Sequence, residues 1–518
     1  MRKVYYSCKP QWGFQDLSII KELNFLSGHH SQCVLKIFCT LSSYKPLGEK
    51  FPDFVNGTLV PYWKDLIITG IPKEVKYAVR CICSHIRERD ESLLVGVLEE
   101  FVASMSGSEL YLAGLISLGY FGTYLSDKFS KSWLLKLFNV SKNALDKLIF
   151  QDSESLTPDD DPWHQKTDLP YDIRCKVEAL KAITRFVIRL NNKSLTNTVM
   201  DVLKKIIQGN GAYSETDKLT VSAKAWLRLT CGCCFLKLCD AKRIYDHIPR
   251  KAFFQMAKLM KDESPVVRRR FVTKLSKKLR QWKKQKFGLP SVFISYFALC
   301  ALEKNYTLKS EMENELNQLY TGISQMHHQL PQVFPDFCVH VAVELLALLV
   351  YDTIDSIKSV EQVYSCLEFL FKALFETKNR IFVHFSTDYF SGVFDNIREC
   401  KNIVEPENDV LNKKMWAVCE IGKFFLSTVP FKLNNKAISP ASRVDPSYIL
   451  YCSIDNTNIK HLPKNVDKYL MESLIKRKVI VGAKTKVLLD EEETEYEEST
   501  SDEEQVHYNF HFCYNYLD

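Results

Sequence analysis

The sequence predicts an all-α fold, a hooked superhelical solenoid built from HEAT-type helix pairs. Three observations support this prediction. Apolar residues recur at spacings of three and four over most of the 518 residues. Glycine and proline number only 18 each, as expected for helices joined by short loops. The segment 259–268 has the form of a turn between the two helices of one repeat.

In this turn an apolar helix ends and Asp262 follows it. Pro265 opens the next helix, where its missing N–H costs nothing because the first turn leaves that donor unpaired in any case. An amphipathic helix then runs from Val267 to about Trp282. A helix pair of this kind buries its apolar face only against neighbouring copies, so the motif predicts a repeat array that binds partners along an extended surface.

Further helix pairs are expected from the same pattern. Helices that resemble the second member of a pair begin near residues 73, 108, 171, 218 and 265, which gives intervals of 35, 63, 47 and 47 residues. Most of these approach the HEAT period of ~40–47 residues. The interval of 63 residues holds an extra helix, about 132–150, and a loop at 151–170 with six acidic residues and one lysine. We expect this loop to project from the solenoid.

The pattern divides the chain into four parts. Residues 1–55 are expected to supply N-terminal helices that cap the array, and 56–288 the HEAT repeats. Residues 289–482 should form longer helical repeats and an irregular cap at 438–465, and 483–518 a disordered acidic tail. The longer helices are expected at 291–302, 310–328, 337–351, 360–375, 386–397 and 410–427.

Composition narrows the function classes. The N-terminus has no apolar segment of a signal peptide, and the longest apolar run, 337–351, is too short to cross a bilayer, so no membrane association is expected.

Seventeen cysteines lie scattered through predicted helices and are expected to be reduced. Cys231, Cys233 and Cys234 have no second cluster to complete a zinc site, and the same holds for Cys81 with His85. Both groups are interpreted as packing residues, with no metal and no cofactor.

No motif of an enzyme is present. The sequence contains no glycine-rich phosphate loop, and Ser117, which lies between Gly114 and Gly119, has the wrong spacing for a nucleophile elbow. The chain is therefore expected to be non-catalytic and to take no small-molecule substrate.

The candidate binding surface is the segment 268–286, which has ten basic residues and no acidic one. Its inward stripe is apolar, so the cations should cover the exposed half of one helix and its extension. An ordinary solvated face is one interpretation. The mutual repulsion of ten cations favours the other, a site for a polyanion such as DNA, an inositol phosphate or an acidic protein segment. The ten residues are Arg268, Arg269, Arg270, Lys274, Lys277, Lys278, Arg280, Lys283, Lys284 and Lys286.

The acidic tail contrasts with the rest of the chain. Residues 490–504 hold ten acidic residues and no basic one, so the net charge of +7 becomes +17 without them. This separation allows the tail to mask the basic body. Ser499 and Ser501 each have an acidic residue three positions later, which is the pattern of acid-directed phosphorylation.

Five stretches carry a resemblance to a known family, in matching order and spacing: 71–82, 107–129, 176–182, 262–279 and 294–301. Over roughly 68–482 the chain resembles the C-terminal half of the HEAT-repeat cohesin regulators of the "precocious dissociation of sisters" family. The resemblance implies a nuclear, chromatin-associated scaffold that binds the kleisin subunit of cohesin and helps to maintain and release sister-chromatid cohesion. It also implies that the surface for the releasing factor Wapl lies in the half that is not matched. The alternative is another HEAT adaptor, such as a karyopherin-type transport receptor.

Overall fold

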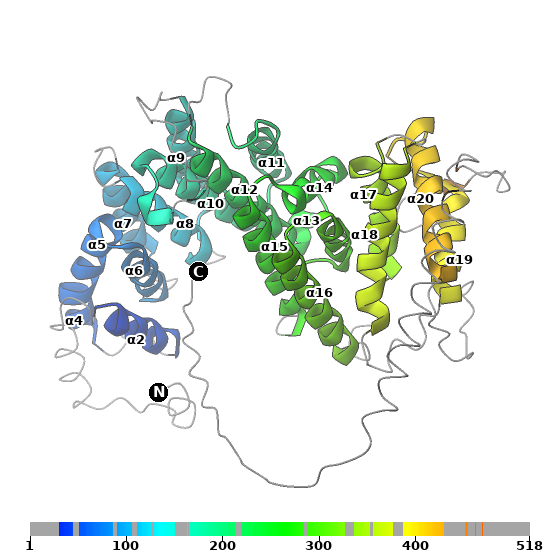
Figure 1. Cartoon of the computed structure of the whole chain (residues 1–518). Helices are drawn as coiled ribbons and strands as arrows, with labels where there is room; N and C mark the ends of the chain where they lie inside the picture. The colour runs from blue at the N-terminus through cyan, green and yellow to red at the C-terminus, as the bar shows by residue number, and fades with distance from the viewer. Residues whose placement is uncertain are drawn as a thin grey trace, which may run out of the picture.

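The computed structural model shows an all-α solenoid, which confirms the predicted fold class (Figure 1). The helices follow one another across the molecule in chain order, from α2 (Ser31–Tyr44) at one end to α20 (Asp409–Thr428) at the other. The structure describes residues 31–44, 51–85, 91–105, 111–125, 129–150, 163, 165–212, 219–283, 288–326, 336–352, 356–376, 387–402, 404–428, 451–453, 462 and 469. The predicted tail, 483–518, lies outside them.

One row of helices forms the continuous spine of the array. Each member contacts the next, although a further helix separates most of them in sequence. The row consists of α6 (Pro72–His85), α8 (Tyr111–Tyr124), α10 (Tyr171–Leu190), α12 (Val221–Cys239), α15 (Pro265–Leu279), α16 (Tyr306–Met326), α18 (Ile357–Glu376) and α20. Five of these begin within three residues of the predicted second helices, at 72, 111, 171, 221 and 265.

The other helices form a second row or connect the two. They are α4 (Pro52–Phe54), the π-helix η1 (Val55–Leu59), α5 (Val60–Thr69), α7 (Glu91–Ser104), α9 (Lys131–Phe150), η2 (Lys166–Asp168), α11 (Lys193–Gln208), α13 (Lys242–Tyr245), α14 (Arg250–Ala257), η3 (Lys258–Lys261), η4 (Arg280–Lys283), η5 (Ser291–Leu302), α17 (Asp336–Leu349) and α19 (Thr387–Arg398). Helix α9 packs along α10. It is the first helix of that pair and not an extra one, so the 63-residue interval owes its length to the loop that follows.

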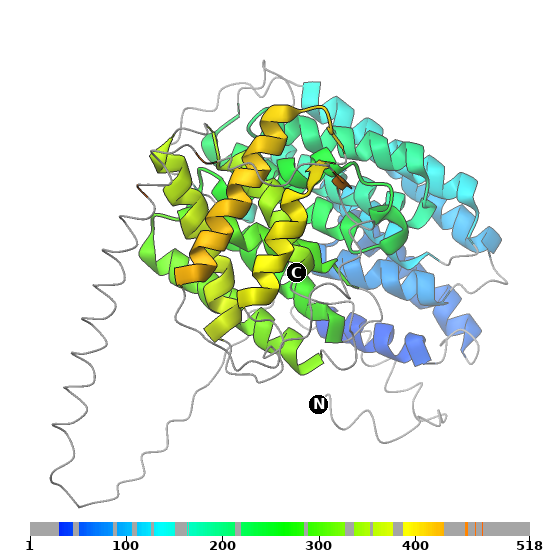
Figure 2. The ribbon, with the colours of Figure 1, turned by 90° about the vertical axis from the view of Figure 1, so that its right-hand side faces the viewer.

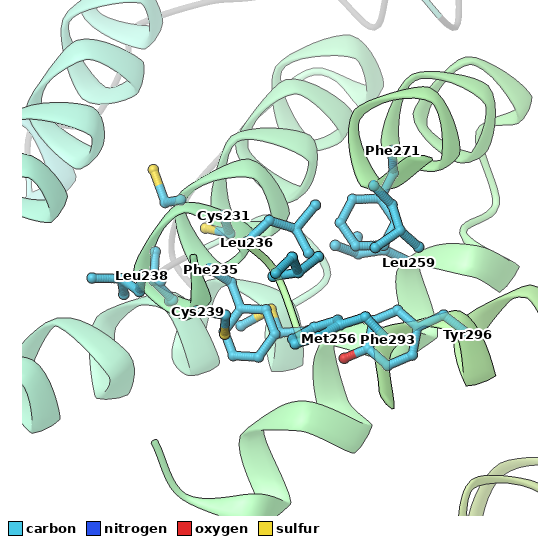
Figure 3. Close-up of a cluster of buried hydrophobic side chains, with 14 of the residues drawn as sticks. Cys231, Phe235, Leu236, Leu238, Cys239, Met256, Leu259, Phe271, Phe293 and Tyr296 are labelled. Atoms are coloured by element: carbon cyan, nitrogen blue, oxygen red, sulfur yellow. The ribbon is translucent and has the colours of Figure 1, made fainter. Parts of the chain in front are cut away.

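One large apolar cluster runs through the described part of the array, and a small second cluster lies around Leu169 and Trp226. Cys231, Phe235 and Cys239 on α12 face Phe271 and Tyr296 from later elements (Figure 3). Burial raises the pKa of the Cys231 and Cys239 thiols well above the usual value, which keeps them neutral. The cysteines of this cluster therefore act as core residues, as the sequence predicts.

The predicted repeat turn is present and is held by a buried ion pair. Helix η3 ends at Lys261, and α15 begins at Pro265. The Asp262 carboxylate accepts from the backbone N–H of Ser264 at 2.9 Å. It also binds Arg228 of α12 through Nε at 2.7 Å and Nη2 at 2.9 Å, with both side chains almost fully buried. This pair ties the turn of one repeat to the second helix of the preceding repeat.

Local differences from the predicted pattern concern two segments, 291–302 and the strand pair near the C-terminal end. Residues 291–302 form a 3₁₀-helix, in which Phe293, Tyr296 and Leu299 recur every three residues and are all buried. Near the C-terminal end, β2 (Tyr451–Ser453) pairs antiparallel with β1 (Cys400–Asn402), within the region predicted to be an irregular cap. At the N-terminal end, α2 packs on α6 and buries Leu35 and Phe38, whereas residues 1–30 lie outside the described part.

Figure 2, turned by 90°, places α18, α19 and α20 at the near end of the array, with the N-terminal helices behind. None of the helices in the described part of the chain is long and apolar enough to span a membrane.

Candidate polyanion-binding surface

Helix α15 carries the basic segment predicted from the sequence, but carboxylates from other elements pair with several of its cations. Arg268 binds Glu303 through Nε at 2.5 Å and Nη2 at 2.9 Å. Arg269 binds Glu311 at 2.8 Å. The remaining pairs are Arg280 with Glu315, at 2.6 Å, and Lys278 with Asp240. The absence of acidic residues within the segment therefore does not leave these four side chains without counter-ions.

Arg270 is held by aromatic rings. Its guanidinium carbon lies 4.7 Å from the ring centre of Trp163 and 5.3 Å from that of Trp226, and the two indoles stack at 4.8 Å. Desolvation lowers the pKa of Arg270. Trp163 belongs to the acidic loop that was expected to project, so this end of the loop packs onto the array. Residues 151–162 of the loop lie outside the described residues.

Lys274 and Lys277 are the predicted cations that stay available on α15. Lys277 is exposed and Lys274 is partly exposed, and no carboxylate of the described residues lies within ion-pair distance of either. The side chain of Lys283 is outside the described part of the structure, as are Lys284, Lys286 and the candidate phosphorylation sites Ser499 and Ser501. These positions remain predictions.

The structure joins Lys274 to cations of other helices. Lys237 of α12 is largely buried, and the charges of Arg185, Lys278 and Lys274 act on it. Desolvation first, and then these neighbouring charges, lower the pKa of Lys237 from 10.5 to about 7. The cations meet because α10 packs on α12 and α12 on α15.

Two tyrosines of α8 extend this surface toward the N-terminal end. The Arg185 guanidinium carbon lies 4.5 Å from the ring centre of Tyr120, and that ring stacks on Tyr124 at 6.0 Å. Arg80 of α6 lies 5.8 Å from the Tyr124 ring. Arg185 also fits against Gly119, where an added Cβ would lie 2.5 Å from its Nη1. We call this surface the cross-helix basic row: Arg80, Arg185, Lys237, Lys274 and Lys278, with Tyr120 and Tyr124 between the arginines.

The row contains three residues that the sequence alone did not single out as a site. Arg80, Arg185 and Lys237 lie far apart in sequence and become neighbours only because α6, α8, α10, α12 and α15 stack side by side. The only sequence feature that these three residues share is a position on the polar face of a helix predicted to be the second of a pair. Chemically, a row of cations with interleaved aromatic rings suits an extended polyanion better than a compact substrate.

A second concave feature lies between α14, α17 and the start of α20. A cavity of about 280 Å³ is lined by Phe254, Leu348 and Val404, among others. Arg250 pairs with the buried Glu344 there, and Lys251 pairs with Glu405 at 2.8 Å. Both carboxylates of the lining, Glu344 and Glu405, are thus already paired with cations of α14. The described residues contain no cluster of three or more histidine, cysteine or acidic side chains that could hold a metal ion.

Comparisons with known proteins agree with the fold. The family model "Sister chromatid cohesion protein PDS5 protein" matches residues 18–436. The chain is 24% identical over 392 residues to PDS5 homolog A of Danio rerio, which covers 72% of this chain and 28% of that relative. It is 25% identical over 415 residues to PDS5 homolog B of Mus musculus, which covers 76% of this chain and 27% of that relative. The matches do not favour the karyopherin alternative.

The chain spans less than a third of the length of these relatives. The family match nevertheless includes the whole spine from α6 to α20, together with every residue of the cross-helix basic row. On this match the chain belongs to the sister chromatid cohesion protein PDS5 family.

Proposed function

We propose that this chain is a non-catalytic, cohesin-associated scaffold of the nucleus that binds the kleisin subunit and regulates the maintenance and release of sister-chromatid cohesion. The observation that carries the proposal is the family match over residues 18–436, which spans the continuous helical spine from α6 to α20. An uninterrupted spine offers one long surface, as suits a protein that holds an extended segment of a partner.

A binding assay with purified components tests this proposal. The full chain, immobilised, should retain purified kleisin and should not retain a Wapl peptide, because the surface for Wapl is expected in the part of the family that this chain does not match. Retention of Wapl without kleisin would contradict the assignment. Repeating the assay with kleisin alone in solution at increasing concentrations gives the affinity of the chain for kleisin.

We further propose that the cross-helix basic row contacts duplex DNA near cohesin. Support comes from four cations, Arg80, Arg185, Lys237 and Lys274, that have no carboxylate partner among the described residues. Non-specific DNA affinity should then fall with salt, with a slope of about −0.9 in log–log form for each phosphate contact.

Fluorescence anisotropy with a labelled duplex measures this slope. The variant Lys274→Glu/Lys277→Glu should weaken binding by at least tenfold at low salt and flatten the slope. The matched control is Lys204→Glu/Lys205→Glu on α11, which reverses the same charge on the other row of helices. Equal losses in both variants would show that only the net charge matters and would refute a localised site.

A further inference from the structure

The cross-helix basic row has an excess of positive charge that the described part of the fold does not balance. Of its five cations, Lys278 pairs with Asp240, and the other four have no described carboxylate within ion-pair distance. Elsewhere on α15 and η4 the fold places a glutamate against each arginine that lacks an aromatic partner, namely Arg268, Arg269 and Arg280. Lys277, three residues after Lys274 on α15, likewise has no described carboxylate within ion-pair distance, so it adds to this excess.

Lys237 makes the imbalance costly. The lowered pKa of its ammonium, about 7, reflects burial beside three other cations. A bound anion would offset the desolvation cost and the repulsion and would favour the charged form of Lys237, because it would supply the opposite charge that the surrounding helices lack. The cross-helix basic row is thus suited to bind an anionic partner.

The spacing of the row indicates an extended acidic peptide. Packed helices lie about 8–10 Å apart, so cations on successive helices recur at about that interval. An extended chain advances about 3.3 Å per residue, which places every third residue opposite a new helix. Within residues 490–504 no gap between acidic residues exceeds three positions, and no lysine or arginine intervenes. Such a segment presents a carboxylate close to each cation in any register.

The segment is also within reach of the row. The Leu462 N–H donates to Glu420 of α20 at 2.9 Å, and the Tyr469 hydroxyl donates to Glu361 of α18, so the chain is anchored on the C-terminal helices. The 21 residues from Tyr469 to Asp490 span at most about 75 Å when extended. Only α16 separates α18 from α15 in the spine, and α12 follows next. The helix spacing makes this a separation of about 30 Å.

We infer that residues 490–504 of this chain bind the cross-helix basic row and compete there with other polyanions. Phosphorylation of Ser499 or Ser501 adds about −1.5 to −2 charges each and strengthens the contact. Removal of the segment's charge frees the row. The contact itself does not depend on the proposed DNA binding, whereas its regulatory effect rests on that proposal.

Zero-length carbodiimide cross-linking of the full chain, read by mass spectrometry, tests the contact directly. It joins carboxylates to amines that already touch. Cross-links from 490–504 should reach Lys237, Lys274 and Lys277 at least fivefold more often than the control amines Lys193, Lys204 and Lys205 on α11. They should fall at least fivefold between 0.05 and 0.5 M salt, because exposed ion pairs are screened.

A variant of the arginines sharpens the test, since arginine does not form these cross-links. Arg80→Gln/Arg185→Gln weakens the row and leaves every reporting lysine in place, so cross-links to Lys274 should fall at least fivefold. The control Arg243→Gln/Arg269→Gln removes the same charge elsewhere and should leave them unchanged. Circular dichroism establishes that both variants are folded. Cross-links spread evenly over all exposed lysines would overturn the proposal, and so would cross-links that join isotope-labelled and unlabelled chains.

The regulatory effect has its own readout. Changing Glu491, Glu492, Glu493, Glu495, Glu497 and Glu498 to Gln should raise the affinity for a labelled DNA duplex at least tenfold, and Ser499→Glu/Ser501→Glu should lower it at least twofold. If the cross-links form as expected and DNA affinity stays low in every variant, the contact stands and the DNA proposal fails. If DNA binds the row and the tail variant leaves its affinity unchanged, the competition proposed here is wrong.

Discussion

The buried pair of Arg228 and Asp262 should be worth several kcal/mol to the array. Both side chains are almost fully buried, at 3% and 4% exposure, and two hydrogen bonds of 2.7 and 2.9 Å join them. With charge centres about 4 Å apart and an effective dielectric constant of about 20, their attraction is about 4 kcal/mol. Loss of Arg228 leaves the Asp262 carboxylate buried without a counter-ion, a defect that costs about 3–5 kcal/mol. Loss of Asp262 costs less, because Arg228 also pairs with the exposed Glu263 at 3.0 Å.

A double-mutant cycle measures this coupling. Asp262→Asn keeps an acceptor for the Ser264 N–H and removes the charge, while Arg228→Met keeps the volume of the side chain. Arg228→Met should lower the free energy of unfolding by about 3–5 kcal/mol, and Asp262→Asn should lower it by less, because Glu263 still pairs with Arg228. The double variant should lose no more than one of the singles, because it leaves no unpaired charge, so the coupling energy should be at least about 2 kcal/mol.

Urea denaturation followed by circular dichroism gives the free energies, and hydrogen–deuterium exchange localises the loss to α12 and α15. Local readout is needed because a repeat array can unfold in parts. A coupling energy below about 1 kcal/mol, or losses that simply add, would refute the argument that a buried pair joins the two repeats.

Three further predictions concern single sites. Lys237→Met should raise the melting temperature below pH 7 in 0.5 M salt. The lysine has a pKa near 10.5 in the unfolded state and about 7 in the folded state. The unfolded state therefore binds more protons between these two pH values, and the stability of the wild type rises with pH there. The difference in stability between variant and wild type, at most about 5 kcal/mol, should disappear toward pH 10. Parallel pH profiles of the two proteins would contradict a lowered pKa of Lys237. Gly211→Ala should destabilise by more than about 1 kcal/mol, because φ is +97° and the new Cβ would lie 2.4 Å from the Lys224 carbonyl oxygen. Gly96→Ala in α7, where the space is open, should stabilise the protein by up to about 1 kcal/mol. If calorimetry showed that Gly211→Ala and Gly96→Ala change stability in the same direction, backbone conformation would not be the cause of the change. Trp163→Ala removes the ring stacked on Trp226 and Arg270. It should cost about 3 kcal/mol, the low end for a tryptophan because this ring is only partly buried, and it should speed proteolysis at 163–170. An unchanged cleavage rate would mean that this packing does not hold the loop.

The acidic loop and the 3₁₀ segment are two places where the local sequence pattern does not predict the conformation. Residues 163–170 are the end of the acidic loop that the sequence predicts to project, yet Leu169 joins a small apolar cluster with Ile173, Ala223 and Trp226. Residues 291–302 are apolar on all sides and could equally form an α-helix. In both segments the neighbours that decide the conformation come from other repeats, so no window of sequence contains them.

The sequence by itself determined the helices, the starts of the spine helices at 72, 171 and 265, the turn at Asp262 and the buried cysteines. These features depend on helical periodicity and on capping chemistry, which act over a few residues. Only the tertiary structure decided the charge of the binding surface. It brought Asp240, Glu303, Glu311 and Glu315 to the cations of α15 from 35 to 42 residues away. It also assembled Arg80, Arg185 and Lys237 into one row, because an ion pair depends on distance in space, and the stacking of helices sets that distance.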